Sequence, residues 1–239
     1  MTASTRPRAD TRQAIVEAAV GLLRSGGAEA VTTRAVAEAA GVQAPAIYRA
    51  FGDKDGLLEA VVEHELAEHV AAKAAVVRAA GESGADPVED LREGWRSQVE
   101  FGLSHPAVFG LLSDPARAGR SAAAQAGREV LAARVHRVAQ AGRLAVGEQH
   151  AAELVHAAGT GLVLTLLALP ADRRDPALAD AMLDAVLARV LVDAPTAGDP
   201  GVVPAAAALR AHADDLDVLS PGERSLLAEW LDRVVAAGR

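Results

Sequence analysis

Residues 41–54 read GVQAPAIYRAFGDK, and they differ in composition from the alanine-rich chain of 239 residues around them. The stretch holds two glycines, a proline, the only tyrosine of the protein and one of its two lysines. Gly41 fits the left-handed position that ends a helix. Pro45 fits the first turn of a helix, where its missing N–H needs no acceptor. The stretch therefore predicts a turn followed by a short helix over residues 44–50.

Helix signals lie on both sides of this turn. Asp10 is a candidate N-cap for a first helix, whose apolar positions recur at helical spacing up to Gly26-Gly27. Thr32 is a candidate N-cap for a two-turn second helix, and Asp53 for a long fourth helix. Two short helices joined by a glycine-containing turn form a helix-turn-helix. The side chains expected in its core are Leu22, Val36, Ile47 and Phe51.

The outer face of the second short helix suits contact with DNA. Small residues there allow close approach to a major groove, and Arg49 can donate to a phosphate or to guanine. Tyr48 combines an apolar stem with a hydroxyl that can reach a phosphate oxygen; the alternative is a core aromatic residue with a solvated hydroxyl. The residues left on this face are Gln43, Ala44, Ala46 and Arg49.

The charge distribution agrees with this interpretation. The chain as a whole has a net charge of −8. Residues 1–54, however, carry seven basic and five acidic residues, whereas the other 185 carry 17 and 27. A mildly positive end on an acidic body suits a protein that presents that end to a polyanion.

The order and spacing of these features closely resemble the N-terminal domain of TetR-family transcriptional regulators over about residues 10–62. The shared features are Ala18-Ala19, threonine at the start of the second helix, Ala39-Ala40-Gly41-Val42, Tyr48 with Phe51, and Lys54 before a long helix. The family pattern usually has a serine where this chain has Gln43, so the bases that are read do not carry over.

The resemblance implies roles for individual residues. Thr32, Thr33 and Arg34 match positions that contact the DNA backbone, although Arg34 can also be read as a solvent-facing arginine. Tyr48 and Lys54 match phosphate contacts. The groove-facing positions are matched by Gln43, Ala44, Ala46 and Arg49.

The middle of the chain predicts a helical bundle. An apolar stripe marks a helix over residues 86–103, a short helix follows over 107–112, and Pro115 opens a long helix to about Ala141. Their aromatic residues either line an effector pocket or form ordinary core, and the resemblance implies the pocket. The residues expected to line it are Trp95, Gln98, Val99, Phe109 and Leu112.

The later helices are expected over residues 148–169 and 175–192, and both are apolar nearly all round. In TetR-like proteins the corresponding helices pack against their copies in a second subunit, which implies a homodimer. The longest uncharged apolar run is too short to span a bilayer, so no membrane partner is expected. A Pro/Gly-rich linker and a helix that opens with a capping box at Ser220 form a tail over residues 195–239.

Catalytic signatures are missing from the sequence. It has no cysteine, no phosphate-cradling glycine loop and no nucleophile elbow, and it lacks an apolar signal peptide. His64 and His69 lie five residues apart, about 140° around a helix, and cannot jointly hold one ion. We therefore expect a cytoplasmic protein that is not an enzyme and that has no catalytic residue, cofactor or metal site.

These observations predict an all-α regulator. It would have a disordered leader (1–9), a helix-turn-helix domain (10–54), a helical effector-binding and dimerisation domain (55–194) and the tail (195–239). Its expected partners are a palindromic double-stranded DNA operator, a largely apolar small-molecule effector and a second copy of the chain. The expected activity is that of a ligand-responsive repressor, with an activator as the alternative within this class. A helical-bundle enzyme or carrier and a protein-interaction adaptor are the alternatives outside it.

Overall fold

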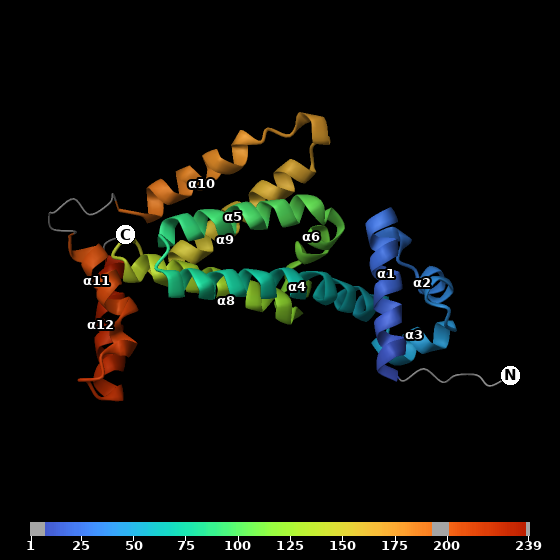
Figure 1. Cartoon of the computed structure of the whole chain (residues 1–239), viewed down its shortest axis with the longest axis horizontal. Coiled ribbons are helices and arrows are strands. Elements are labelled where there is room, and N and C mark those ends of the chain that lie inside the picture. Colours follow the sequence, from blue (N-terminus) through green and yellow to red (C-terminus); the bar gives the residue numbers. More distant parts are fainter. Residues whose placement is uncertain (1–7, 193–200, 238–239) are drawn as a thin grey trace. The chain divides into compact units, whose positions relative to one another are not determined.

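The computed structural model describes residues 8–192 and 201–237, and these residues form an all-α fold, as predicted (Figure 1). Within these ranges the sole extended pairing is one antiparallel bridge between Leu144 and Leu191. Most of the predicted leader and the first part of the predicted tail lie outside the described residues. The chain divides into two compact units: Met1–Ala72 with Ser104–Gly127, and Lys73–Leu103 with Arg128–Arg239.

The first unit contains the predicted helix-turn-helix. Thr32 caps the second helix, because its Oγ1 accepts a hydrogen bond from the backbone N–H of Ala35 at 3.1 Å. Gly41 follows with φ 66°, the left-handed conformation expected for it. Asp53 Oδ1 accepts from the backbone N–H of Gly56 at 2.8 Å at the start of the fourth helix. The helices of this unit are α1 (Arg8–Ala30), α2 (Thr33–Ala40), α3 (Ala44–Phe51), the first part of α4 (Lys54–Ser83), α6 (Pro106–Leu112), α7 (Pro115–Arg120) and the start of α8 (Ala122–Gln140).

The core of the three-helix head formed by α1, α2 and α3 differs from the prediction at two positions, Leu22 and Phe51. Val36 and Ile47 are fully buried, as expected. On α1, however, Leu23 is buried and Leu22 is only half-buried. Ile15, Ala19 and Leu23 are spaced by four and form one buried stripe, so a leucine one position earlier lies about 100° away from its centre.

Phe51 is also less buried than predicted. Its side chain is half-buried, and the guanidinium carbon of Arg12 lies 4.7 Å from the ring centroid. A cation over an aromatic face is attracted by the ring quadrupole. Phe51 therefore serves as a contact surface between α1 and α3 rather than as part of the core.

Residues 115–141 form two helices, whereas a single helix was predicted. Ser121 is extended, with φ −77° and ψ 118°, and it separates α7 from α8. Its hydroxyl accepts a hydrogen bond from the N–H of Ala124 at 3.0 Å and donates to Glu63 at 2.8 Å. The carboxylate that holds this break comes from α4, far away in the sequence, so local signals did not reveal it.

The second unit is built around α5 (Pro87–Ser104), which has two different faces. Leu91, Trp95 and Val99 form a buried apolar stripe along one side. Asp90, Gly94 and Gln98, each one position earlier, form a polar stripe about 100° away. The remaining helices of this unit are the later parts of α4 and α8 together with α9 (Glu148–Leu167), α10 (Ala177–Val190), α11 (Val202–Ala211) and α12 (Pro221–Ala237), with short 3-10 turns at Ala171–Arg173 and Ala213–Asp215.

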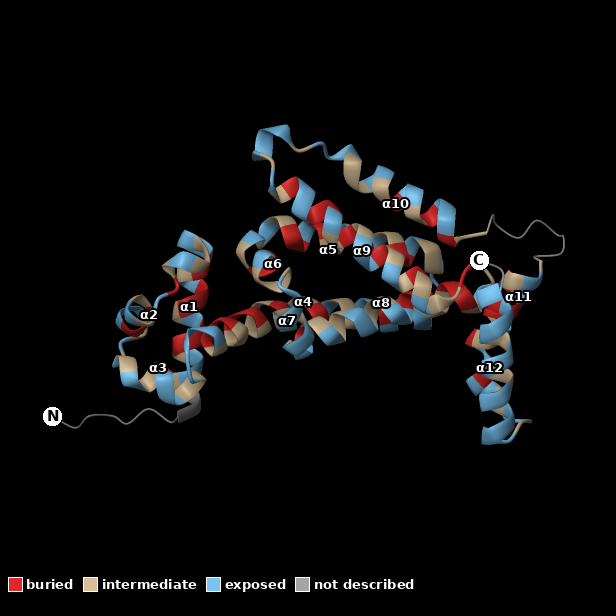
Figure 2. Cartoon of the chain, turned by 180° about the vertical axis from the view of Figure 1, so that it is seen from behind, coloured by how far each residue is buried: buried red, intermediate tan, exposed pale blue. Residues whose placement is uncertain are grey.

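The tail forms a helical pair. The predicted capping box is confirmed: Glu223 accepts from the backbone N–H of Ser220 at 2.8 Å, and Ser220 Oγ accepts from the N–H of Glu223 at 3.4 Å. Helix α12 packs against α11, and Arg210 of α11 pairs with Asp232 of α12 at 3.2 Å. Much of α12 stays exposed, including Trp230 at 53% (Figure 2).

Candidate nucleic-acid interface

The nine residues predicted to contact DNA come from α2, α3, the turn between them and the start of α4. None of the nine is buried in the fold. Tyr48 is 52% exposed, although an apolar ring of this size is usually placed in a core. The exposed members are Thr32, Arg34, Gln43, Tyr48, Arg49 and Lys54, and the half-buried ones are Thr33, Ala44 and Ala46.

The fold itself determines which side of α3 faces outward. Ile47 has 0% exposure and anchors the helix against the rest of the head. Its neighbours Tyr48 and Arg49 are turned away from that anchor and reach solvent. Pro45 lies in the first turn of α3. The side chain of Gln43 makes no capping hydrogen bond, so its amide oxygen and its NH2 group are both available to a partner.

The cations of this surface have no partners among the residues that the structure describes. Arg34, Arg49 and Lys54 make no hydrogen bond or ion pair with any residue in the described ranges. By contrast, Arg24 in the same unit is bound by Glu65 at 2.8 Å. Unpaired cations beside an exposed phenol can reach the phosphates that provide most of the affinity for DNA.

After Lys54, helix α4 carries three carboxylates spaced by four residues: Asp55, Glu59 and Glu63. Side chains of α7 and of the α7–α8 junction bind them. Arg117 Nη2 lies 3.3 Å from Asp55, and Arg120 Nη2 lies 2.6 Å from Glu59. The bond to Glu59 raises the pKa of the Arg120 guanidinium. Glu63 is held by Ser121.

This row of contacts was missed by sequence reasoning, since it depends on residues about 60 positions apart. Its consequence is electrostatic. Carboxylates close to Lys54 would repel DNA phosphates, and paired carboxylates do so less.

A cleft of about 530 Å³ lies in the first unit between α1, α4 and α7. Its lining mixes charged and polar side chains with small apolar ones, and none of the residues predicted for the effector pocket belongs to it. The charged and polar groups that line it are Arg12, Gln13, Glu59, Glu63, His64, Arg117, Arg120 and Ser121.

The five predicted pocket residues are divided between the two units. Phe109 is buried and Leu112 half-buried on α6, in the first unit. Trp95 of the second unit is buried, and its indole N–H donates to the carbonyl of Ala179 on α10 at 3.0 Å. Trp95 also approaches α9 closely, because a Cβ built on Gly159 would lie 3.3 Å from its ring.

The other two predicted pocket residues lie on different faces of α5. Val99 shares the apolar stripe of Trp95, whereas Gln98 lies on the polar stripe and accepts a hydrogen bond from Lys73 Nζ at 2.9 Å.

Metal and membrane signals are weak in the described part of the chain. No three His, Cys, Asp or Glu side chains gather there closely enough to hold a metal ion. Helix α9 alone is long and apolar enough to cross a bilayer, a property that core helices of soluble proteins share.

The sequence similarity to known proteins is concentrated in the three-helix head. The family described as "Bacterial regulatory proteins, tetR family" matches residues 15–61. The tetracycline repressor protein class A from transposon 1721 of Escherichia coli is 46% identical over 55 residues, which is 23% of this chain and 26% of that protein. The class C tetracycline repressor of Escherichia coli is 46% identical over 52 residues, 22% of this chain and 24% of that protein. The matched stretch thus spans about a quarter of these curated relatives.

Solved structures extend the likeness of fold to most of the chain. A tetR-family regulator from Mesorhizobium loti superposes with a TM-score of 0.56 at 21% identity, over 79% of this chain and 100% of that one. A TetR-family regulator from Agrobacterium tumefaciens gives 0.54 at 20% identity, over 78% and 100%. The multidrug binding protein EbrR, solved with imidazole, gives 0.53 at 22% identity, over 78% and 93%.

Proposed function

We propose that the chain, whose residues 15–61 match the TetR family of bacterial regulatory proteins, is a sequence-specific DNA-binding transcriptional regulator. The observation that carries the proposal is the outward face of α3 and its flanks. There an exposed tyrosine lies among cations that no described residue of the chain neutralises. Such a surface is complementary to a phosphate backbone.

Each residue of the face has a proposed role. Thr32, Thr33 and Arg34 hold the DNA backbone at the start of α2. Tyr48 and Lys54 contact phosphates on the far side of the recognition helix. The residues that enter the major groove are Gln43, Ala44, Ala46 and Arg49, of which Arg49 carries the strongest base contact.

We further propose that the protein acts as a homodimer on a palindromic operator. Helices α9 and α10 pack against each other, and parts of both remain exposed (Figure 2). Among the exposed apolar side chains is Leu164 of α9, at 40%. A second copy would cover this face. Two recognition helices would then enter successive major grooves about 34–36 Å apart.

A small-molecule effector would control this binding, which makes the protein a cytoplasmic ligand-responsive repressor. EbrR, a multidrug binding protein solved with imidazole, shares the fold over most of both chains. Helix α4 carries Lys54 at its start and Lys73 in the second unit, so it is the proposed route of coupling. The effector and DNA affinities must then be reciprocally linked.

Selection of bound DNA from a random pool tests this function. The proposal predicts enrichment of an inverted repeat whose half-sites lie one helical turn apart. Arg49→Ala should change the preferred bases, whereas Tyr48→Ala and Lys54→Ala should weaken binding to every sequence alike. A pool that shows no enrichment, or three variants that all bind as the wild type does, would rule out the proposed docking surface.

A further inference from the structure

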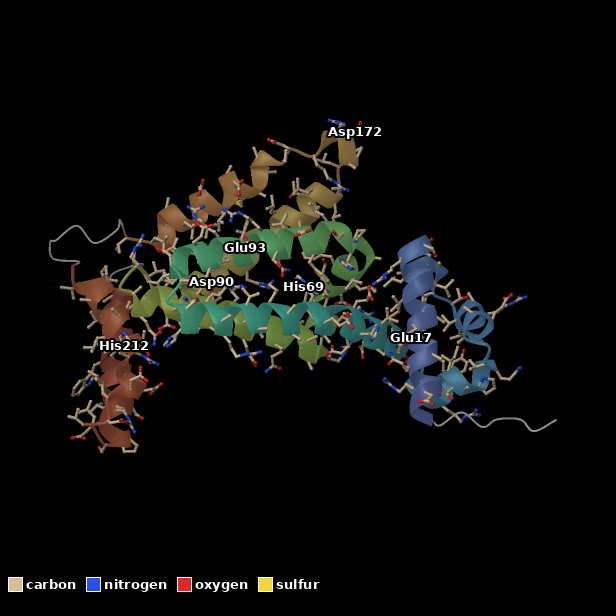
Figure 3. The ribbon with its side chains drawn as sticks, viewed as in Figure 1. Glu17, His69, Asp90, Glu93, Asp172 and His212 are labelled. Carbon is tan, nitrogen blue, oxygen red and sulfur yellow. The ribbon has the colours of Figure 1, made fainter. Side chains whose placement is uncertain are left out.

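In the second unit one buried carboxylate lies among three cations, of which Arg134 is buried and Lys73 and Arg137 are half-buried. Asp90, on the polar stripe of α5, is 8% exposed, and Figure 3 shows it between the ribbons of α5 and α4. Both of its carboxylate oxygens are engaged by arginines of α8: Oδ1 accepts from Arg134 Nε at 3.3 Å, and Oδ2 from Arg137 Nη1 at 2.9 Å. Lys73 of α4 adds a third cation, and it lies close enough to Arg134 for the two positive charges to repel each other.

The guanidinium of Arg137 has structural partners on both of its Nη atoms. Its Nη2 donates to the carbonyls of Ala80 at 3.1 Å and Ala85 at 2.9 Å, at the carboxyl-terminal end of α4. The last carbonyls of a helix lack intrahelical partners, and a cation there is favourable. Asp90 is thus shared by two arginines, and the groups without a carboxylate of their own among the described residues are Lys73 Nζ and the Nη groups of Arg134.

The polar stripe of α5 is shaped around these two cations. A Cβ on Gly94 would lie only 2.5 Å from Nη1 of Arg134, so the glycine leaves the space that the guanidinium occupies. One turn further on, Gln98 accepts a hydrogen bond from Lys73 through Oε1, which leaves its amide N–H groups free to donate. Lys73, Arg134 and Gln98, from three different helices, thus bring their donors to the same face of α5 within about one helical turn.

Such an arrangement is unfavourable without an anion. Burial and the charge of Arg134 lower the pKa of Lys73 from 10.5 to about 8, so at neutral pH it is still mostly charged. A largely desolvated cation whose hydrogen-bond partner among the described residues is a neutral amide costs free energy, and an apolar residue of similar size would be more stable there. Groups of this kind concentrate at functional sites.

We propose that Lys73, Arg134 and the amide of Gln98 bind the carboxylate of a small organic acid, and that this acid is the effector. The inference rests on the proposed function, since it names the chemical class of the effector. It also changes the expectation drawn from the sequence, which was a largely apolar molecule. An amphiphilic acid satisfies the cations and still has an apolar part to bury.

Thermal unfolding of the full-length protein tests the charge requirement. Acetate, butyrate, octanoate and benzoate are each titrated beside the corresponding neutral amide at constant ionic strength. We expect at least one acid to bind about tenfold or more tightly than its amide, as charge-assisted hydrogen bonds require. Equal shifts with acid and amide throughout the series, or no shift with any of them, would overturn the inference.

Two variants test whether the preference for acid over amide arises at Lys73. Lys73→Met, which keeps the length of the side chain and removes its charge, should abolish the preference for acid over amide. Arg78→Met, an exposed position on the same helix, should leave that preference intact. Without ligand, Lys73→Met should raise the unfolding midpoint by about 2–4 °C, because it removes a desolvated charge. A lower midpoint would mean that Lys73 supports the fold, and would overturn the assignment.

DNA binding by the wild-type protein, measured in parallel, separates this inference from the proposed function. Binding without acid, weakened by the acid that binds best, is the expected result. If DNA binding is retained but no acid affects it, the inference fails and the proposed function stands. If no DNA is bound under any condition, the proposed function itself fails.

Discussion

Glu63 of α4 accepts a hydrogen bond from the backbone N–H of Ala123 at 2.5 Å, so a carboxylate of one helix caps the start of another. The other oxygen of the same carboxylate accepts from the hydroxyl of Ser121 at 2.8 Å. Free N–H groups at a helix start favour a negative charge. This contact ends α7, begins α8 and holds their junction against α4.

Glu63→Ala should therefore destabilise the protein by about 1–3 kcal/mol, since it leaves partly buried donors without an acceptor. Glu68→Ala is the matched control on the same helix, because Glu68 is exposed and has no partner in the described chain. Urea denaturation of both variants measures the difference. Equal stabilities would show that the cap is energetically neutral.

A second prediction concerns the joint between α3 and α4. A Cβ on Gly56 would lie 2.1 Å from the carbonyl oxygen of Phe51, whereas nothing lies within 4 Å of a Cβ on Gly81 of the same helix. Glycine to alanine normally stabilises a helix by about 0.5–1 kcal/mol. Gly81→Ala should show this gain, and Gly56→Ala should instead lose about 1–3 kcal/mol through overpacking.

The same two variants separate stability from function. Gly56→Ala displaces the recognition helix from α4 and should weaken DNA binding even at temperatures where the protein stays folded. Gly81→Ala should bind DNA as the wild type does. Gains in stability from both substitutions would refute the close approach of α3 and α4.

The depressed pKa of Lys73 predicts a pH dependence of stability. Between pH 8 and pH 10.5 the unfolded lysine holds its proton more firmly than the folded one, so this residue makes the protein more stable as pH rises through that window. Relative to Lys73→Met, the wild type should be less stable at pH 7, by at most about 3 kcal/mol, and should approach the variant near pH 10.5. Urea denaturation at several pH values measures this difference; a constant gap would contradict the prediction.

Dimerisation through α9 and α10 predicts the outcome of a charge placed on that face. Leu164→Glu should convert the protein to a monomer that keeps its helix content, since a carboxylate buried in an apolar interface lacks a partner. Val76→Glu on α4, where the side chain is 49% exposed, should leave the oligomeric state unchanged. Sedimentation and circular dichroism report both properties. A dimer that survives Leu164→Glu would place the interface elsewhere.

The features that the sequence predicted correctly depend on neighbouring residues. The caps at Thr32, Asp53 and Ser220 and the left-handed turn at Gly41 each involve groups within about four positions. Local chemistry of this kind can be read from residue types and spacing. The head could therefore be recognised before its structure was known.

The features that were missed depend on residues brought together by the fold. The break at Ser121 is held by Glu63, 58 positions earlier. The cluster around Asp90 joins side chains of α4, α5 and α8, and no pattern within one helix reveals it. The two faces of α5 are likewise assigned by their neighbours, which is why Trp95 and Gln98 were grouped in one pocket.

The salt dependence of binding to the selected DNA tests the central claim most directly. If the face around Tyr48 docks on DNA, the affinity of the wild type should fall steeply and linearly on a double-logarithmic plot against salt. Lys54→Ala should bind more weakly to all sequences and reduce the slope by about one for each head that contacts DNA, while the exposed Arg78→Ala should change neither. An affinity that is insensitive to salt, or a slope that Lys54→Ala leaves unchanged, would contradict the account.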